Sequence, residues 1–451
     1  MSEPETSLEP EDGASGFETE EPSPHPRLGV LPSDWVIHEI SDIAEVVGGS
    51  TPSTNNEDYW GGEIAWATPT DITELSGNTI DETADTITKD GLNSASTHLL
   101  PPYSVLMTSR ATIGKCAVNT VEMATNQGFQ NLAPKEDVET WYLHYMMLDT
   151  ASFLESLGAG STFDEVSKSV VESVEIPVPP LEEQRKIASV LYTVDQAIQK
   201  TEEMLEQAEK VQTGVMQDLF RNGVQECPTK ELRRIGKIPE HWDVVKLEDV
   251  SLNITDGTHF SPPTIDEGYP YITSTNIRDW GFDLDDLKYI SEEDHKEIIS
   301  SCNPEPGDVL YVKDGANTGN VYVNTLDFEF SLLSSVALIK PNKNQVKPWF
   351  LKYLFTWPKF RQLVLSQMSG TGISRLTISK LEKTDILLPP INEQNKIIEI
   401  LNQFHEYQSV HRQKGERLGR LKRGLMQDLL SGEIRTDDKD IEIVNEVLAH
   451  G

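Results

Sequence analysis

Residues 176–219 read IPVPPLEEQRKIASVLYTVDQAIQKTEEMLEQAEKVQTGVMQDL, and residues 386–429 read ILLPPINEQNKIIEILNQFHEYQSVHRQKGERLGRLKRGLMQDL. The two stretches align without a gap and share a double proline, a Glu-Gln pair, a Lys-Ile pair and a final Met-Gln-Asp-Leu. Each copy follows a segment of similar size, but these two segments differ far more from each other. This pattern indicates a molecule that performs one task in two places, with two different targets.

Each repeated block predicts one long helix. The double proline suits the first turn of a helix, and the glutamates that follow it suit the positive end of the helix dipole. From Ile187 to Leu219, apolar residues recur at spacings of three and four, as in a coiled-coil seam. The second seam is weak around Gln408, His411 and Gly415. Forty residues at ~1.5 Å each make a rod of about 60 Å. Its exposed apolar stripe predicts the duplicate helix as its partner, antiparallel if a pseudo-twofold relates the two copies.

The repeat extends into the segments before each helix. Residues 31–43, LPSDWVIHEISDI, are similar to residues 238–250, IPEHWDVVKLEDV. Short apolar strands then lead into polar loops rich in Gly, Ser and Thr in both copies. We interpret Trp35 and Trp242 as core anchors. The sequence thus predicts a mixed α/β (α+β) protein with two globular domains and two long helices.

The charge of the chain is strongly negative. Its 451 residues, which predict two to four structural units, carry 74 acidic and 38 basic side chains, a net charge of −36. Residues 1–26 hold eight acidic and no basic side chains and predict a disordered tail. An acidic surface along the whole chain favours a halophilic prokaryote with a high-salt cytoplasm; an ordinary acidic soluble protein is the alternative.

Several classes of protein are disfavoured by the sequence. We find no signal peptide and no apolar run near the ~18 residues of a membrane span. Three distant cysteines favour a reducing cytoplasm over a disulfide framework. The chain has no GxxxxGK[ST] phosphate loop and no HExxH motif, and its two Pro-Pro turns, LPPY and SPPT, each lack part of the loop that an adenine methyltransferase needs.

PPLEEQRKI and PPINEQNKI, each before a helix that ends in MQDL, together with LLSGEIR at 429–435, resemble the specificity (S) subunit of type I restriction-modification systems. The resemblance implies two target-recognition domains that each read half of a bipartite DNA site, and two antiparallel helices that set the spacer. It also implies a subunit without catalysis of its own, which binds two methyltransferase (M) subunits and, in the full complex, restriction (R) subunits. S-adenosylmethionine, ATP and Mg would belong to those partners, with no cofactor in this chain and no metal site.

The resemblance divides the chain into seven expected segments. These are an acidic tail (1–26), target-recognition domain 1 (27–177), conserved helical region 1 (178–222), a linker (223–237), target-recognition domain 2 (238–387), conserved helical region 2 (388–432) and a C-terminal tail (433–451).

Candidate DNA contacts lie on the polar and Gly-rich loops. Arg110 and Lys115 share one loop, although residues 27–177 contain only six basic residues. Each candidate has a solvated loop residue as its alternative. The candidates are Thr68, Thr70, Ser109, Arg110, Thr112, Lys115, Ser161, Thr273, Asn276, Lys313, Asn317, Thr318, Asn320, Thr371 and Arg375. Candidates for holding the helices and partner subunits come from the repeated block: Pro180, Glu183, Gln184, Gln217, Pro390, Glu393, Gln394 and Gln427.

Two alternatives remain at the level of sequence. One is a two-headed interaction scaffold whose loops bind a ligand other than DNA. The other is a fused restriction-modification enzyme, which the lack of a convincing cofactor loop disfavours. If DNA is the ligand, the acidic charge implies recognition through short-range hydrogen bonds and shape in high salt, where long-range repulsion is screened.

Overall fold

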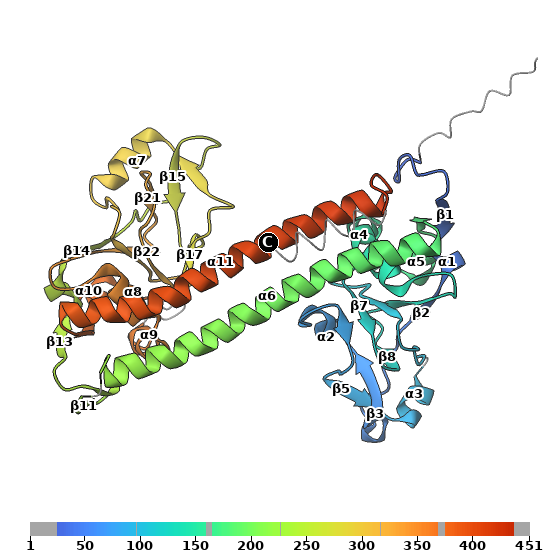
Figure 1. Ribbon diagram of the computed structural model, residues 1–451, viewed down its shortest axis with the longest axis horizontal. Helices are drawn as coiled ribbons and strands as arrows, with labels where there is room; N and C mark the ends of the chain where they lie inside the picture. The colour runs from blue at the N-terminus through green and yellow to red at the C-terminus, as the bar shows by residue number, and fades with distance from the viewer. Residues whose placement is uncertain are drawn as a thin grey trace, which may run out of the picture. The chain divides into compact units, whose positions relative to one another are not determined.

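The computed structural model describes residues 25–95, 97–158, 165–225, 227–315, 317–368 and 375–436. The chain divides into two compact units, residues 1–199 with 417–451 and residues 200–416. Each unit combines one globular domain with part of the two long helices, α6 (Leu181–Asn222) and α11 (Ile391–Leu430) (Figure 1). The predicted acidic tail lies almost entirely outside the described residues.

The two long helices pack antiparallel, as the sequence predicts. In the first unit, Lys422 Nζ of α11 lies 2.6 Å from Asp195 Oδ1 of α6. In the second unit, Gln408 Nε2 of α11 donates to Gln212 Oε1 of α6 at 3.1 Å. The later part of one helix therefore lies against the earlier part of the other in each unit, and Figure 1 shows the two helices side by side.

The weak stretch of the second seam lies opposite weak positions of the first. Gln408 is buried and bonds to Gln212, while a Cβ on Gly415 would lie 3.7 Å from Thr201 Cγ2. Polar and small side chains of one helix thus meet polar and small side chains of the other. Both helices therefore lose their apolar positions at the same level, where a polar contact replaces apolar packing.

The first domain contains two main sheets. Strands β2-β9-β6-β7-β4 form a five-stranded sheet, β5-β3-β8 form a three-stranded one, and β1 pairs with β10. Its elements are β1 (Val36–Glu39), α1 (Ile40–Ile43), β2 (Ala44–Gly48), η1 (Glu57–Tyr59), β3 (Trp60–Ala67), α2 (Pro69–Thr73), β4 (Thr79–Ile80), β5 (Asp85–Ile87), α3 (Lys89–Ser94), β6 (Val105–Met107), β7 (Cys116–Asn119), β8 (Met123–Thr125), β9 (Gln130–Pro134), α4 (Thr140–Gly158), α5 (Lys168–Glu172) and β10 (Glu175–Val178).

The second domain repeats this plan. Strands β14-β22-β19-β20 form a four-stranded sheet, β18-β15-β21 form a three-stranded one, and β13 pairs with β23. Its elements are β11 (Thr229–Leu232), β12 (Gly236–Pro239), β13 (Asp243–Lys246), η2 (Leu247–Val250), β14 (Ser251–Asp256), β15 (Tyr269–Ile272), β16 (Ile277–Arg278), β17 (Gly281–Phe282), β18 (Lys288–Ile290), α7 (Glu292–Ile299), β19 (Val309–Val312), β20 (Val321–Val323), β21 (Ser331–Leu332), β22 (Val336–Pro341), α8 (Pro348–Thr356), α9 (Pro358–Leu365), α10 (Ile378–Glu382) and β23 (Asp385–Leu388).

The two domains share one frame despite their different sequences. The central strand of each small sheet, β3 or β15, pairs antiparallel on one side and parallel on the other. The larger sheets match strand by strand over β2-β9-β6-β7 and β14-β22-β19-β20. The mixed α/β prediction is therefore confirmed for both domains, and the likeness extends to parts that look unrelated in sequence.

Each domain has one large core that also includes the helix pair. Trp35 and Trp242, predicted as anchors, are buried in these cores. Ile187 and Leu191 of α6 join the first core, and Ile397 and Leu401 of α11 join the second. The start of each long helix is thus fixed to the domain that precedes it. Across the described ranges, no helix is both long enough and apolar enough to cross a bilayer.

Candidate nucleic-acid interface

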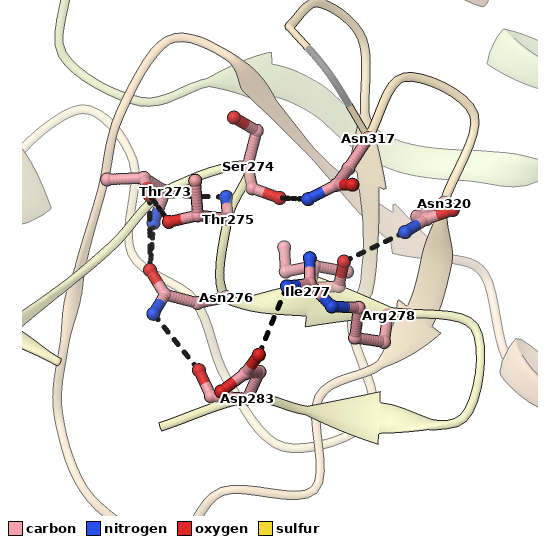
Figure 2. Close-up of polar contacts among 9 residues, drawn as sticks. All are labelled: Thr273, Ser274, Thr275, Asn276, Ile277, Arg278, Asp283, Asn317 and Asn320. Atoms are coloured by element: carbon pink, nitrogen blue, oxygen red, sulfur yellow. Dashed lines mark hydrogen bonds and ion pairs between the residues drawn. The ribbon is translucent and has the colours of Figure 1, made fainter. Parts of the chain in front are cut away.

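In the second domain, the structure brings two predicted polar segments together (Figure 2). Asn317 Nδ2 donates to the carbonyl oxygen of Ser274 at 3.0 Å, and Asn320 Nδ2 donates to that of Ile277 at 3.1 Å. The loop after β15 is also held from within, since Asn276 Oδ1 accepts from the backbone amide of Thr273 at 2.9 Å. The amide side chains therefore fix the shape of the loops.

In the first domain, a third segment joins the two predicted loops. Asn126 donates its backbone amide to Ala67 at 3.0 Å, and Ser109 donates its own to Gly128 at 2.7 Å. A Cβ on Gly128 would lie 2.8 Å from Pro69 Cγ, so only glycine fits this approach. Residues 125–129 thus lie between the loop at 68–71 and the turn at 108–115.

The two Gly-containing turns share the same backbone hydrogen bonds. Gly114 donates to the carbonyl oxygen of Thr108 at 2.9 Å, and Gly319 donates to that of Val312 at 2.8 Å. Both glycines have positive φ, 83° and 95°. Ser109 and Lys313, which follow Thr108 and Val312, also make matching bonds. The backbone amide of Val166 donates to the carbonyl oxygen of Ser109 at 3.1 Å, and that of Leu376 donates to the carbonyl oxygen of Lys313 at 3.0 Å. These bonds align the turns residue by residue at both ends, although the second turn is one residue longer.

Different side chains stand at the matched positions. Ser109 corresponds to Lys313, and Lys115 corresponds to Asn320. Arg110 forms an ion pair of 2.8 Å with Glu165, and Arg375 stands where the first domain has this glutamate. One frame therefore presents two different sets of hydrogen-bonding groups.

Several predicted contact residues are occupied within the fold. Ser109 is fully buried, and Lys313 is buried with its Nζ 3.2 Å from Asp256 Oδ2. Thr68 caps α2, its Oγ1 donating to Asp71 Oδ2 at 2.6 Å. Asn276 is buried inside its own turn. These side chains shape the loops; burial keeps Ser109, Lys313 and Asn276 from the loop surface, and Thr68 is half-buried.

The remaining predicted residues reach the surface to different extents. Thr70, Lys115 and Arg375 are exposed; Arg110, Thr112, Thr273, Asn317, Thr318 and Asn320 are half-buried. Buried Oγ1 of Thr112 and Nε of Arg110 have no hydrogen-bond partner among the described residues. Ser161 and Thr371 lie outside the described residues.

Sequence reasoning missed the segment that joins the loops of the first domain. Gln127 is exposed at its tip, and Thr51 Oγ1 donates a short hydrogen bond to Gln127 Oε1. Thr51 lies in the loop after β2, and Gly49 lets this loop lie close to the segment, since a Cβ there would lie 2.0 Å from the carbonyl oxygen of Asn126. Asn126-Gln127-Gly128 has the composition of an exposed turn and carries amides of the kind that read adenine edges, which is the signal that could have found it.

The predicted helix and partner contacts divide into two groups. Glu183, Gln184, Glu393 and Gln394 point into their own domains. Gln184 and Gln394 are 1% and 0% exposed, and each donates through Nε2 to the carbonyl oxygen of a proline in the double-proline turn at 2.9 Å. These side chains fix each helix to its domain. The exposed group is Pro180, Gln217, Pro390 and Gln427.

Metal chemistry finds no support in the side chains that the structure places. Within the described segments, no three His, Cys, Asp or Glu residues gather in a way that could hold a metal ion.

Comparison with known proteins identifies the family. The model of the type I restriction modification DNA specificity domain matches residues 32–210 and again residues 239–419. The chain belongs to this family. It is 30% identical over 423 residues to the type I restriction enzyme MjaIX specificity subunit of Methanocaldococcus jannaschii, covering 91% of this chain and 96% of that protein.

More distant relatives agree. The EcoKI specificity subunit of Escherichia coli is 23% identical over 62% of this chain and 61% of its own length. A crystal structure of the S subunit of a type I restriction-modification system from M. genitalium superposes with a TM-score of 0.56 at 14% identity, covering 90% of this chain and 99% of that one. The fold of this specificity subunit is thus that of the family, with two DNA specificity domains and two long helices packed together.

Membership fixes the general role. This specificity subunit supplies DNA recognition to a type I restriction-modification complex, assembles with modification and restriction subunits and is itself non-catalytic. The cofactors of the complex reside in those other subunits. The alternatives of a scaffold for a non-DNA ligand and of a fused enzyme are therefore set aside. The halophilic origin finds no support in these comparisons and stays a prediction from the net charge of −36.

Proposed function

We propose that this specificity subunit reads an asymmetric, bipartite DNA sequence, one half with each domain. The observation that carries the proposal is the pair of matched turns with the segments bonded to them, where one hydrogen-bonded frame holds Lys115 and Glu165 in one domain but Asn320 and Arg375 in the other. Sequence is read by hydrogen bonds to base edges, so different groups on one frame give different half-sites.

In the first domain, the proposed reading surface combines three segments. Thr70 comes from the first loop, Gln127 from the joining segment, and Arg110 with Lys115 from the turn. Gln can form paired hydrogen bonds with adenine, and Arg or Lys with guanine. Thr51 orients Gln127 by its hydrogen bond to Oε1, which leaves the amide nitrogen directed elsewhere. We therefore assign base contact to Gln127 and Arg110 before the buried Ser109.

In the second domain, the proposed surface uses the tip of the longer turn. Thr318, Asn317 and Thr273 are half-buried around it, and exposed Arg375 stands on the neighbouring segment. Asn317 and Asn320 hold the loop after β15 (Figure 2), so their loss would alter recognition indirectly. Buried Lys313 supports the turn through Asp256.

The remaining features of the assembly are proposed on the same basis. The segments keep the boundaries expected from sequence, with domains at 27–177 and 238–387 and helical regions at 178–222 and 388–432. Exposed Gln217 and Gln427 on the helices are candidate contacts for two methyltransferase subunits that modify adenine. We place the complex in a reducing, salt-rich cytoplasm, where screening lets an acidic chain approach DNA.

Methylome sequencing of a host with and without this gene tests the proposal. We expect loss of one adenine-methylation motif made of two unlike half-sites separated by unspecified bases. Gln127→Ala should relax one half-site and leave the other unchanged. The matched control is Thr120→Ala, since Thr120 is exposed just after β7 of the same domain. The proposal would be contradicted if the lost motif were continuous and palindromic, or if no methylation motif were lost.

A further inference from the structure

The second unit contains a polar cavity of about 440 Å³ that DNA recognition leaves unexplained. Its walls come from the loop at 278–280, from α8 and α9, and from facing positions of α6 and α11. Four cationic side chains line it: Arg278, Lys352, Arg361 and Arg412. Among the described residues of the lining, the carboxylates are Glu209 and Asp279. In a chain of net charge −36, this local excess of positive charge is unusual.

Of the four cations, Lys352 is the one without an ion pair of its own among the described residues. Its side chain lies on α8, is 4% exposed and places Nζ 4.5 Å from the ring centre of Tyr353. Each arginine has a carboxylate partner, whereas no ion pair or hydrogen bond to Lys352 Nζ occurs among the described residues. Burying an ammonium group without a partner costs free energy, so its retention calls for an explanation.

The arginines contribute unused donors to the same cavity. Arg278 pairs with Asp283 at 3.0 Å (Figure 2), Arg361 with Asp279, and Arg412 with Glu209 at 3.4 Å.

These pairs leave one N–H group of each arginine unsatisfied. Within the described part of the chain, Arg278 Nη1, Arg361 Nε and Arg412 Nε are buried and have no acceptor. Arg412 is also held over the ring of Trp280 at 4.8 Å. Unsatisfied buried donors on three sides of a cavity require either ordered water or a ligand with several acceptor oxygens.

We propose that this cavity binds a small oxyanion of the phosphate type, with Lys352 as its central positive charge. Such an ion supplies the missing counter-charge to Lys352 and accepts hydrogen bonds from the guanidinium edges. Glu209 and Asp279 repel an anion, but each is already paired with an arginine, and Lys352 feels Asp279 without forming an ion pair with it. The site lies where the loop at 278–280 meets the helix pair of this unit, so an anion there would link the two.

The corresponding place in the first unit is built differently. His144 of α4, in TWYLHY, stands where α8 has Lys352 in PWFLKY. There, a lysine of the long helix supplies the cation: Lys422 pairs with Asp195, and Asn78 Nδ2 donates to the same carboxylate at 2.6 Å. In the first unit, the lysine at this place is thus paired with Asp195. In the second unit, Lys352 has no ion pair among the described residues.

Thermal unfolding of the full chain in phosphate or chloride at constant ionic strength tests the proposal. At phosphate concentrations well above its dissociation constant, binding stabilises the folded chain, and we expect a rise in Tm of about 3 °C or more beyond the chloride control. Lys352→Met should fold normally and lose this rise. Lys359→Met, which alters an exposed lysine of α9, should keep it.

Two sources of the oxyanion are distinguished by adding a cognate DNA duplex. If the cavity takes a backbone phosphate of DNA, Lys352→Met weakens duplex binding and inorganic phosphate competes with DNA. If it takes a free anion, duplex affinity is unchanged and the phosphate-dependent rise persists with DNA bound. Equal Tm values in phosphate and chloride, or a rise that Lys352→Met retains, would overturn the proposal.

Discussion

The indole Nε1 of Trp242 donates a hydrogen bond to Oε2 of Glu393 at 3.1 Å, joining the start of the second domain to the first turn of α11. Trp35 makes the same bond to Glu183 of α6, also at 3.1 Å. Each carboxylate also bonds to the segment that follows the other long helix: Glu183 to the segment after α11, and Glu393 to the segment after α6. Arg435 Nε lies 2.6 Å from Glu183 Oε1, and the backbone amide of Val224 donates to Glu393 Oε1 at 3.2 Å.

Glu393→Ala is expected to destabilise the second unit by about 1–3 kcal/mol. The substitution leaves the indole N–H of buried Trp242 and the amide of Val224 without their acceptor, and unsatisfied buried donors carry this cost. Urea denaturation followed by circular dichroism measures the change. Glu399→Ala, at an exposed position of the same helix, should stay within about 0.5 kcal/mol of the parent. Equal effects of the two substitutions would show that the Trp242–Glu393 bond is not an anchor.

Lys352→Met is expected to stabilise the chain in phosphate-free buffer at pH 7, by about 2–3 kcal/mol. Burial lowers the pKa of Lys352 from 10.5 to about 8. The unfolded chain therefore binds this proton more tightly, and folded stability rises as pH increases from about 8 to 10.5.

The stabilising effect of Lys352→Met should accordingly shrink over that pH window, because the parent lysine becomes neutral in both states. Chemical denaturation at several pH values measures the difference between the two proteins. A substitution that destabilises the chain at pH 7 would show that Lys352 contributes favourable packing or pairing that outweighs its burial.

His144→Leu is expected to make the chain more resistant to acid. Burial, with the nearby Lys422 charge, lowers the pKa of His144 from 6.5 to about 3. Unfolding therefore takes up a proton between these values, and stability falls as pH is lowered through the window. The loss attributable to His144 is about 3 kcal/mol between pH 7 and pH 4.

Unfolding free energies at pH 7 and pH 4 test this expectation against a matched control. His98→Leu, at an exposed position of the same domain, should leave the pH dependence unchanged. His405 of the second unit, whose pKa is lowered to about 4 by burial and by nearby cations, should contribute a similar acid loss. Identical pH profiles for the parent and His144→Leu would rule out a buried neutral imidazole at this position.

Insertion of one heptad into both long helices, after Gln199 and after Glu416, is expected to lengthen the spacer between the half-sites. Seven residues add about 10 Å, close to three base pairs of DNA, while the seam keeps its period. Methylome sequencing should show both half-sites unchanged. An insertion in α6 alone shifts the Gln212–Gln408 register and should weaken folding instead. Altered half-site sequences in the double insertion would show that the helices do more than set the spacing.

The long helices could be predicted because their apolar spacing and their proline positions are local features of the sequence. The seam from Ile187 to Leu219 and the matching double prolines predict the long helices, which the structure confirms. The domains were harder to match, since their short strands carry different residues. TWYLHY and PWFLKY occupy matching helices, yet the match involves few identities and was not recognised in the sequence.

The exposure of the candidate contact residues was harder to predict than the loops that carry them. Ser109 and Asn276 have the right chemistry on the right segments, but packing buries both. Gln127 lies far along the chain from Thr51, and only folding places it beside that residue at the surface. Local sequence reveals that a loop is polar, whereas the burial of each side chain depends on segments that are remote in sequence.

By itself, the sequence determined that this protein has two similar halves, two long helices that pair and two different sets of polar loops. These follow from period and repetition, which act over neighbouring residues. Tertiary structure alone decided that Glu183 and Gln184 anchor α6 to its domain, that Gln212 meets Gln408 at the weak part of the seam, and that Lys352 is buried beside three arginines. Hydrogen bonding and desolvation depend on which distant groups come together, and no local pattern specifies those encounters.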